Sequence, residues 1–292
     1  LAVGSGLGFL TIYIGPTLMA LLGWSVWQKI IRISKVHRIT SIADFIASRY
    51  GKSTTLGGLA TNIAVIGVIP YIALQLKAIS TGFLLITQYP EVSVSFSFSD
   101  VPIMYDPAFY IALLLAVFAI LFGTRHLDAT ERHEGLVAAI AFESIVKLAA
   151  FLTVGIFVTY FIHNGLGDLF QKAAAYAGTQ NAPGAESGSN VALFFDKYLT
   201  IKGQGFSATD WSIYLLISML AILFLPRQFQ IAVVENVNEE HLNKAIWLFP
   251  LYLLAINLFV LPVAFSGVLR FPGGSVDADT FVLTLPMAEH QQ

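Results

Sequence analysis

Six long apolar stretches dominate this chain, and the short connectors between them carry most of its charge. They cover roughly residues 5–29, 57–88, 107–123, 135–162, 211–236 and 245–270. A helix needs about 20 apolar residues to cross a hydrocarbon core of about 30 Å, and these stretches are near or above that length. We therefore expect an all-α, polytopic membrane protein with six transmembrane helices in one domain spanning residues 1–292.

Composition excludes several other classes of protein. Hydrophobic residues make up 56% of the chain and charged residues 12%, which is typical of neither a disordered nor a nucleic-acid-binding chain. The net charge of −2 leaves no basic domain to attract nucleic acid, and the absence of cysteine excludes disulfides and thiolate metal sites. No motif of a soluble enzyme is present, so we expect no catalytic residue.

Lys and Arg gather on alternate connectors, which predicts the orientation of the chain. The first connector alone holds six of them: Lys29, Arg32, Lys35, Arg38, Arg49 and Lys52. The first, third and fifth connectors are therefore expected on the cytoplasmic side of the membrane. The long loop 163–210 and both chain ends are then expected outside. Within the first connector, Ser41 precedes Asp44 by three residues, which predicts a capped amphipathic helix over about 39–51.

Prolines mark expected irregularities inside the spans. Gly15-Pro16 is expected to interrupt the first span, and Pro70 to kink the second. In the fifth span, Pro226, Arg227 and Gln228 follow an apolar run without a loop-forming cluster. One interpretation is a broken helix whose freed backbone groups line a cavity, as in secondary transporters. The alternative is a helix that ends at the membrane surface near Arg227.

Polar residues inside apolar spans are the main candidates for function, because they are costly there. Glu143 and Lys147 lie four residues apart, so a helix would pair them on one face. They are either a coupling or gating pair or a structural ion pair. Gln75 and Lys77 in the second span either contact a ligand, or Lys77 extends to the membrane interface. The histidines show no metal-ligand spacing, so no metal site is expected.

Several stretches together resemble the sodium:solute symporter family. Residues 39–52 resemble its cytoplasmic segment. Further stretches are most similar to the branch fused to bacterial sensor histidine kinases: 70–79, 143–148, 225–229 and 247–253. This resemblance implies part of a leucine-transporter-type fold, built from inverted repeats, in a bacterial inner membrane. The six spans would be core helices two to seven. Because the chain begins with Leu1 rather than Met, we interpret it as a fragment that lacks core helices one and eight.

The resemblance also implies roles for individual residues. It implies that the sodium site lies between the two missing helices, so no cofactor or complete sodium site is expected within this chain. Glu131, together with Glu143 and Lys147, is a coupling or gating candidate. Residues on the expected solute pathway are Tyr13, Gln75, Lys77, Ser218, Pro226, Gln228 and Tyr252. Ile14 stands where sugar-transporting members carry an acid, which argues against a sugar. An amino acid or small carboxylate is the favoured ligand, because the buried cation of Lys77 could pair with its carboxylate.

Two main hypotheses for function follow. The chain belongs to the sensory input module of a histidine kinase, with the kinase and its response regulator as partners, or to a stand-alone sodium-coupled transporter. Its ligands would be a small organic solute and Na⁺ in either case. A third, weaker hypothesis is a structural scaffold in which each buried charge serves only packing.

Overall fold

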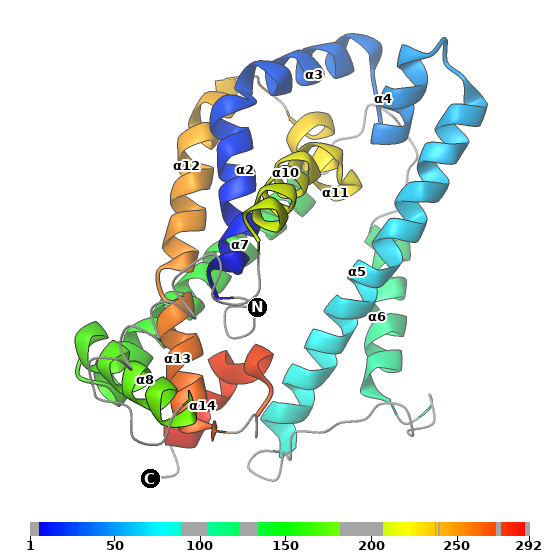
Figure 1. Ribbon diagram of the computed structural model, residues 1–292. Helices are drawn as coiled ribbons and strands as arrows, with labels where there is room; N and C mark the ends of the chain where they lie inside the picture. The colour runs from blue at the N-terminus through cyan, green and yellow to red at the C-terminus, as the bar shows by residue number, and fades with distance from the viewer. Residues whose placement is uncertain are drawn as a thin grey trace. The chain divides into compact units, whose positions relative to one another are not determined.

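Every regular element in the part of the chain that a computed structural model describes is a helix, which confirms the all-α class (Figure 1). The model describes residues 6–88, 104, 106–122, 134–181, 207–236, 238, 240–272 and 276–289. Within these ranges, three helices are long and apolar enough to cross a membrane: Thr54–Thr87, Val137–Ile162 and Glu240–Arg270. Two bent helix pairs raise the number to five if each pair is one span, and Pro107–Leu121 is a shorter apolar helix. The molecule is therefore a polytopic membrane protein, and each of the six expected stretches contains at least one helix.

The described helices divide between two compact units. The first unit comprises residues 1–28, 138–223 and 238–292, and the second comprises 29–137 and 224–237. Each unit contains residues that are distant in sequence, so neither is a simple half of the chain.

In the first unit, helix α2 (Thr11–Leu22) packs along α12 (Glu240–Asn257), as Figure 1 shows. The 3₁₀ helix η1 (Gly6–Leu10) leads into α2. Helix α10 (Ala208–Phe224) contributes nearly all of its length to the same unit. The expected interruption at Gly15-Pro16 is wrong, because α2 runs through Pro16 and the chain instead bends by 73° at Gly23.

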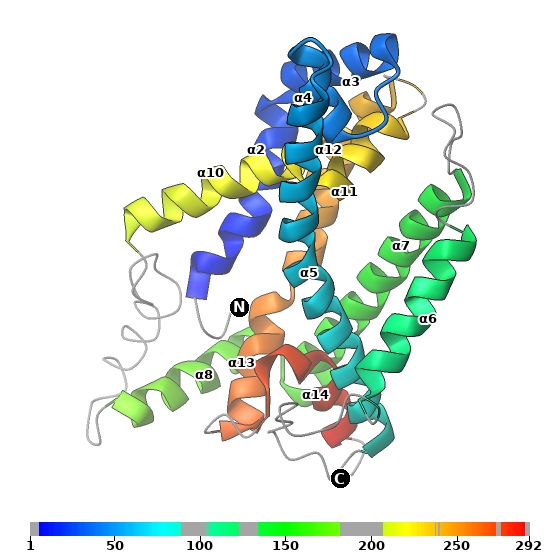
Figure 2. The same ribbon diagram turned by 90° about the vertical axis from the view of Figure 1, so that its right-hand side faces the viewer.

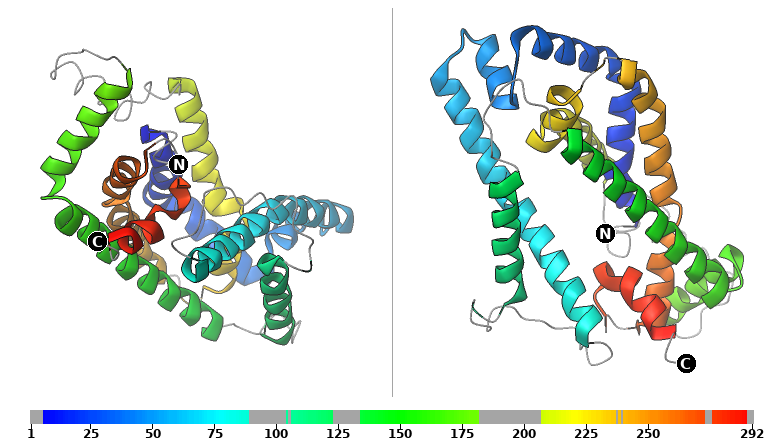
Figure 3. Two further views of the ribbon diagram at one scale, coloured as in Figure 1. Left: turned by 90° about the horizontal axis from the view of Figure 1, so that it is seen from below. Right: turned by 180° about the vertical axis from the view of Figure 1, so that it is seen from behind.

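A second cluster of helices in this unit surrounds α13 (Val260–Arg270) (Figure 3). Helix α7 (Glu134–Phe157) continues as a π-helical turn, η4 (Val158–Ile162), and α8 (Leu166–Asn181) follows. Near the end of the described chain, the 3₁₀ turn η7 (Ala278–Thr280) leads into α14 (Phe281–Glu289). Apolar side chains of α8 and α13 form one core. Apolar side chains of η4, α13 and α14 form a second core. The expected loop 163–210 therefore begins with a packed helix. Helix α14 lies outside the six stretches in which helices were expected from the sequence.

The second unit is built around α5 (Thr54–Gln88), the longest helix of the described chain. Helix α6 (Pro107–Phe122) lies alongside α5 (Figure 2). The second unit begins at Lys29, within helix α3 (Trp24–His37). Helix α4 (Ile42–Arg49) follows and packs on α5. The expected short helix is thus present, and its expected cap is confirmed, since the Ser41 hydroxyl accepts from the Asp44 N–H at 3.1 Å.

A short irregular segment completes the second unit. It consists of α11 (Pro226–Phe229) and the π-helical turn η5 (Gln230–Val234). Phe229 is buried, and its ring lies 5.6 Å from the ring of Phe45 on α4. Pro70 does not end α5, which stays a single helix from Thr54 to Gln88.

Candidate functional site

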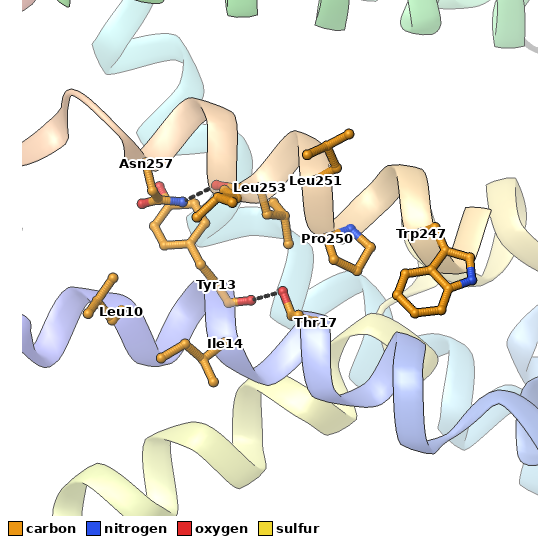
Figure 4. A pocket seen from close by; sticks show the side chains of 10 residues that line it. Leu10, Tyr13, Ile14, Thr17, Trp247, Pro250, Leu251, Leu253 and Asn257 are labelled. Atoms are coloured by element: carbon orange, nitrogen blue, oxygen red, sulfur yellow. Dashed lines mark hydrogen bonds between the residues drawn. The ribbon is translucent and has the colours of Figure 1, made fainter. Parts of the chain in front are cut away.

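A groove between α2 and α12 is the candidate binding site of the first unit (Figure 4). Its volume is about 450 Å³, within the range of small-molecule sites. Apolar side chains form most of its lining: Leu10, Ile14, Trp247, Pro250, Leu251, Leu253 and Leu254. Three polar side chains join them: Tyr13, Thr17 and Asn257. None of these ten residues is charged, so the groove favours a largely apolar ligand.

Among the polar side chains that line the groove, the Asn257 amide oxygen is a buried hydrogen-bond acceptor without a donor. The Thr17 hydroxyl donates to the Tyr13 carbonyl at 2.8 Å, and the Asn257 Nδ2 donates to the Leu253 carbonyl at 2.6 Å. The Asn257 Oδ1 is buried and has no hydrogen-bond partner. Figure 4 shows the Tyr13 ring reaching from α2 toward Asn257 on α12. A buried acceptor without a donor is unfavourable, so this oxygen can gain from a ligand or water that donates to it.

Two further residues of the expected pathway lie on helices of the same unit. Ser218 on α10 packs directly against α2, because a Cβ built on Gly15 would lie 2.6 Å from the Ser218 Cβ. Ser218 therefore takes part in a helix–helix contact, the usual place for a small polar residue in a membrane protein. Tyr252 lies on α12, the helix that contacts α2, but it does not line the groove.

The helix break at Leu225 is the main feature of the second unit. Leu225 has extended dihedral angles (φ −67°, ψ 130°), and Pro226 occupies the first position of α11, where its missing N–H costs nothing. The expected break is therefore present, since α10 ends at Phe224 and a new helical segment begins at Pro226. Phe224, Leu225 and Pro226 line a cavity of about 450 Å³ together with residues of α4 and α5. Its wall is almost entirely apolar.

One polar contact ties the segment after the break to α5. The Arg227 Nη1 donates to the Tyr71 hydroxyl oxygen at 2.9 Å. Gln75 lies one turn further along α5 than Tyr71, so the two share a helix face. Gln75, Lys77 and Gln228 are all exposed within the described structure. The structure thus brings Arg227 to α5, whereas Gln75, Lys77 and Gln228 form no hydrogen bond with one another within the described residues.

The structure describes Glu143, one of the two acidic candidates for a coupling or gating role, but not Glu131. Glu143 and Lys147 form the ion pair that their spacing predicts, with Lys147 Nζ 2.5 Å from Glu143 Oε1. More than half of each side chain is exposed (68% for Lys147 and 54% for Glu143), so the described part of the chain does not enclose the pair. Glu131 lies outside the described residues.

A buried histidine lies at the end of η4, outside the apolar spans. The His163 Nε2 is 3.0 Å from the Ser266 Oγ, and its Nδ1 is buried without a partner. Burial, and secondarily the nearby Lys172 ammonium, lower the pKa of His163 below its ordinary value, although Asp168 and Glu289 act in the opposite direction. Lys172 donates to Asp168 at 2.6 Å, and this bond lowers the pKa of the Asp168 carboxyl.

Some residues of these sites escaped the sequence analysis. Asn257 is an amide inside an apolar span, so the criterion that selected Gln75 could have found it. Arg227 and Tyr71 were part of resembling stretches, but no spacing rule pairs residues 156 positions apart. Within the described ranges, no group of three His, Asp or Glu side chains could hold a metal ion.

Comparison with known proteins gives one informative relative. The chain is 26% identical over 257 residues to a Bacillus subtilis (strain 168) protein with the name "Uncharacterized symporter YhjB". The match covers 87% of this chain and 44% of that protein, so the chain spans less than half the length of the relative. No protein-family model matches the chain. No solved structure matches it.

Proposed function

We propose that this chain is part of a secondary transporter that carries a small organic solute across a bacterial inner membrane by alternating access. The observation that carries the proposal is the break at Leu225–Pro226 between the apolar helix α10 and the short helical segment that follows it. The similarity to a protein named as a symporter supports it. A transporter of this kind would be no enzyme.

The physical argument concerns the backbone at the break. Where a helix is interrupted, carbonyl groups of its last turn lose their intrahelical donors. Such groups cost several kcal/mol each in hydrocarbon, so irregular backbone at membrane depth is tolerated only beside protein or a polar cavity. Secondary transporters use this arrangement to coordinate solutes and ions. The cavity lined by Leu225 and Pro226 lies beside this backbone, and because its side-chain wall is apolar, the freed backbone carbonyls would be its polar groups.

We further propose coupling to Na⁺ and a leucine-transporter-type arrangement of inverted repeats, both on the resemblance to the sodium:solute symporter family. The favoured solute is an amino acid or small carboxylate, whose anionic group would pair with Lys77. The same resemblance supports a role as sensory input module of a histidine kinase, which would signal to a response regulator.

The test is uptake of radiolabelled amino acids and short carboxylates by vesicles that contain the protein, with and without a sodium gradient. Pro226→Ala should reduce uptake severely, since an alanine restores the N–H donor and favours a continuous helix. Pro286→Ala in α14 is the matched control, because it changes a helix-interior proline outside the candidate spans. Sodium-independent, nonsaturable uptake, or unchanged uptake by Pro226→Ala, would refute the proposal. Saturable binding without uptake would favour the sensor.

A further inference from the structure

Helix α3 departs from the direction of the span that precedes it. Gly23 ends α2 with its N–H bonded to the Met19 carbonyl at 2.9 Å, and the chain bends there by 73°. A Cβ at Gly23 would lie 2.7 Å from the Met19 carbonyl oxygen, so a glycine suits this close turn. A helix turned this far from a spanning helix runs nearer to the membrane plane than to its normal.

The residues before the bend are long enough to cross the membrane by themselves. The five residues of η1 and the twelve of α2 rise about 28 Å together, using about 2.0 Å and 1.5 Å per residue. That length nearly matches the hydrocarbon core of about 30 Å. Helix α3 is therefore not needed to complete the span.

The sequence of α3 is unsuited to the hydrocarbon core. Lys29, Arg32 and Lys35 recur every three residues, Arg38 follows the helix, and no acidic residue lies between Trp24 and Ile39. All four basic side chains are exposed. Each cation would cost several kcal/mol at the bilayer centre, so this strip belongs in the headgroup region.

The other faces of α3 are apolar. Trp27 and Ile31 are buried in the protein (8% and 0% exposed). Beside them, Val26, Ile30 and Ile33 form a partly or largely exposed apolar strip at helical spacing, adjacent to Lys29. Exposed apolar residues next to a basic strip are typical of helices that lie in the membrane interface. Trp24 and Trp27 are also the residue type enriched at that depth.

We propose that α3 lies in the membrane interface and that its basic strip binds the phosphates of anionic phospholipid headgroups. Val26, Ile30 and Ile33 would contact the acyl boundary, while Lys29, Arg32 and Lys35 would reach the phosphates. This surface is separate from the solute site and does not depend on the proposed transport activity. It would enrich anionic lipid around this end of α2 and stabilise the bend at Gly23.

Quenching of tryptophan fluorescence by brominated lipid tests the proposal. The chain has four tryptophans, so Trp211→Phe with Trp247→Phe leaves only Trp24 and Trp27, both on α3. The protein is placed in bilayers with brominated phosphatidylglycerol or brominated phosphatidylcholine, and the relative binding constant is read from the quenching. We expect phosphatidylglycerol to bind about fivefold more tightly or better, since one basic residue near the surface contributes about that factor. About 0.5 M salt should weaken the preference through screening.

Matched variants locate the effect. Replacing Lys29, Arg32 and Lys35 by Gln should bring the relative binding constant close to one. Lys172→Gln with Lys244→Gln, which removes exposed charges elsewhere, should leave it unchanged. Equal quenching by the two lipids, a preference that survives the triple substitution, or a salt-independent preference would each overturn the proposal. The salt titration uses the unaltered basic strip, so it decides the matter even if the triple variant does not fold.

Discussion

Gly15 and Ser218 hold α2 and α10 in direct contact, with the Ser218 Cβ 2.6 Å from the place where a Gly15 Cβ would stand. The Leu215 carbonyl oxygen would lie 2.9 Å from the same point. Only hydrogen fits between two helices at this separation. Small residues permit such approaches in membranes, where packing rather than the hydrophobic effect drives helix association.

Gly15→Ala is therefore expected to destabilise the protein by about 1–3 kcal/mol, the usual cost of overpacking. The measurement is the thermal unfolding midpoint in detergent. Gly58→Ala on α5 is the control, because its Cβ would meet nothing within 4 Å. That control should be neutral or slightly stabilising. Combining Gly15→Ala with Ser218→Gly should recover part of the loss, and full independence of the two changes would contradict the contact.

The hydrogen bond between Arg227 and Tyr71 is expected to stabilise the segment after the helix break. Tyr71→Phe removes one partner of a charged hydrogen bond, and we expect a loss of about 1–2 kcal/mol in stability and a clear fall in uptake. Arg227→Gln should produce a similar loss. A double-mutant cycle checks the pairing, since the two losses should not add. Tyr50→Phe changes an exposed tyrosine and serves as control; additive losses would show that the bond does not form.

The extent to which sequence predicts this molecule differs between local and distant features. Local features depend on residues that lie close together in the sequence, and periodicity or proline chemistry indicates them directly. They include helix α4, its Ser41 cap, the Glu143–Lys147 pair and the break at Pro226. The sequence analysis placed the interruption of the first span at Pro16, whereas the chain bends at Gly23. A membrane helix can continue through a proline when neighbouring groups satisfy the freed carbonyl. The groove between α2 and α12 joins residues that are at least 230 positions apart, and a single sequence contains no signal for that pairing.

The environment of His163 predicts a pH dependence of stability. Its pKa is lowered in the folded protein by burial, so the unfolded chain binds a proton at a higher pH than the folded chain does. Stability should therefore fall as the pH drops from above the ordinary histidine value of about 6.5 toward the lower folded value. Asp168 behaves differently, because its lowered pKa matters only below about pH 4.

The measurement is the unfolding midpoint between about pH 7.5 and pH 5, where histidines titrate. His163→Gln should flatten the dependence in this window, whereas His241→Gln, on an exposed side chain, should not. Titration of the His163 imidazole by NMR gives its folded pKa directly. A value at or above the ordinary one would refute the prediction, since Asp168 and Glu289 would then outweigh burial and Lys172.

Asn257 offers a way to separate ligand binding from folding. Its Oδ1 is buried in the groove wall without a donor, so removing that oxygen should not destabilise the empty protein. Asn257→Leu keeps a similar volume but loses the hydrogen bond from Nδ2 to the Leu253 carbonyl. Because the volume is nearly unchanged, we expect the free energy of unfolding to change by no more than about 1 kcal/mol. If the groove holds a ligand that donates to Oδ1, the same variant should bind it about five- to tenfold more weakly, because a buried hydrogen bond contributes about 1–1.5 kcal/mol. The neighbouring Leu254→Ile, which keeps volume and polarity, controls for changes in shape. A large loss of stability in Asn257→Leu would instead assign this amide a structural role, and unchanged binding would exclude it from the ligand site.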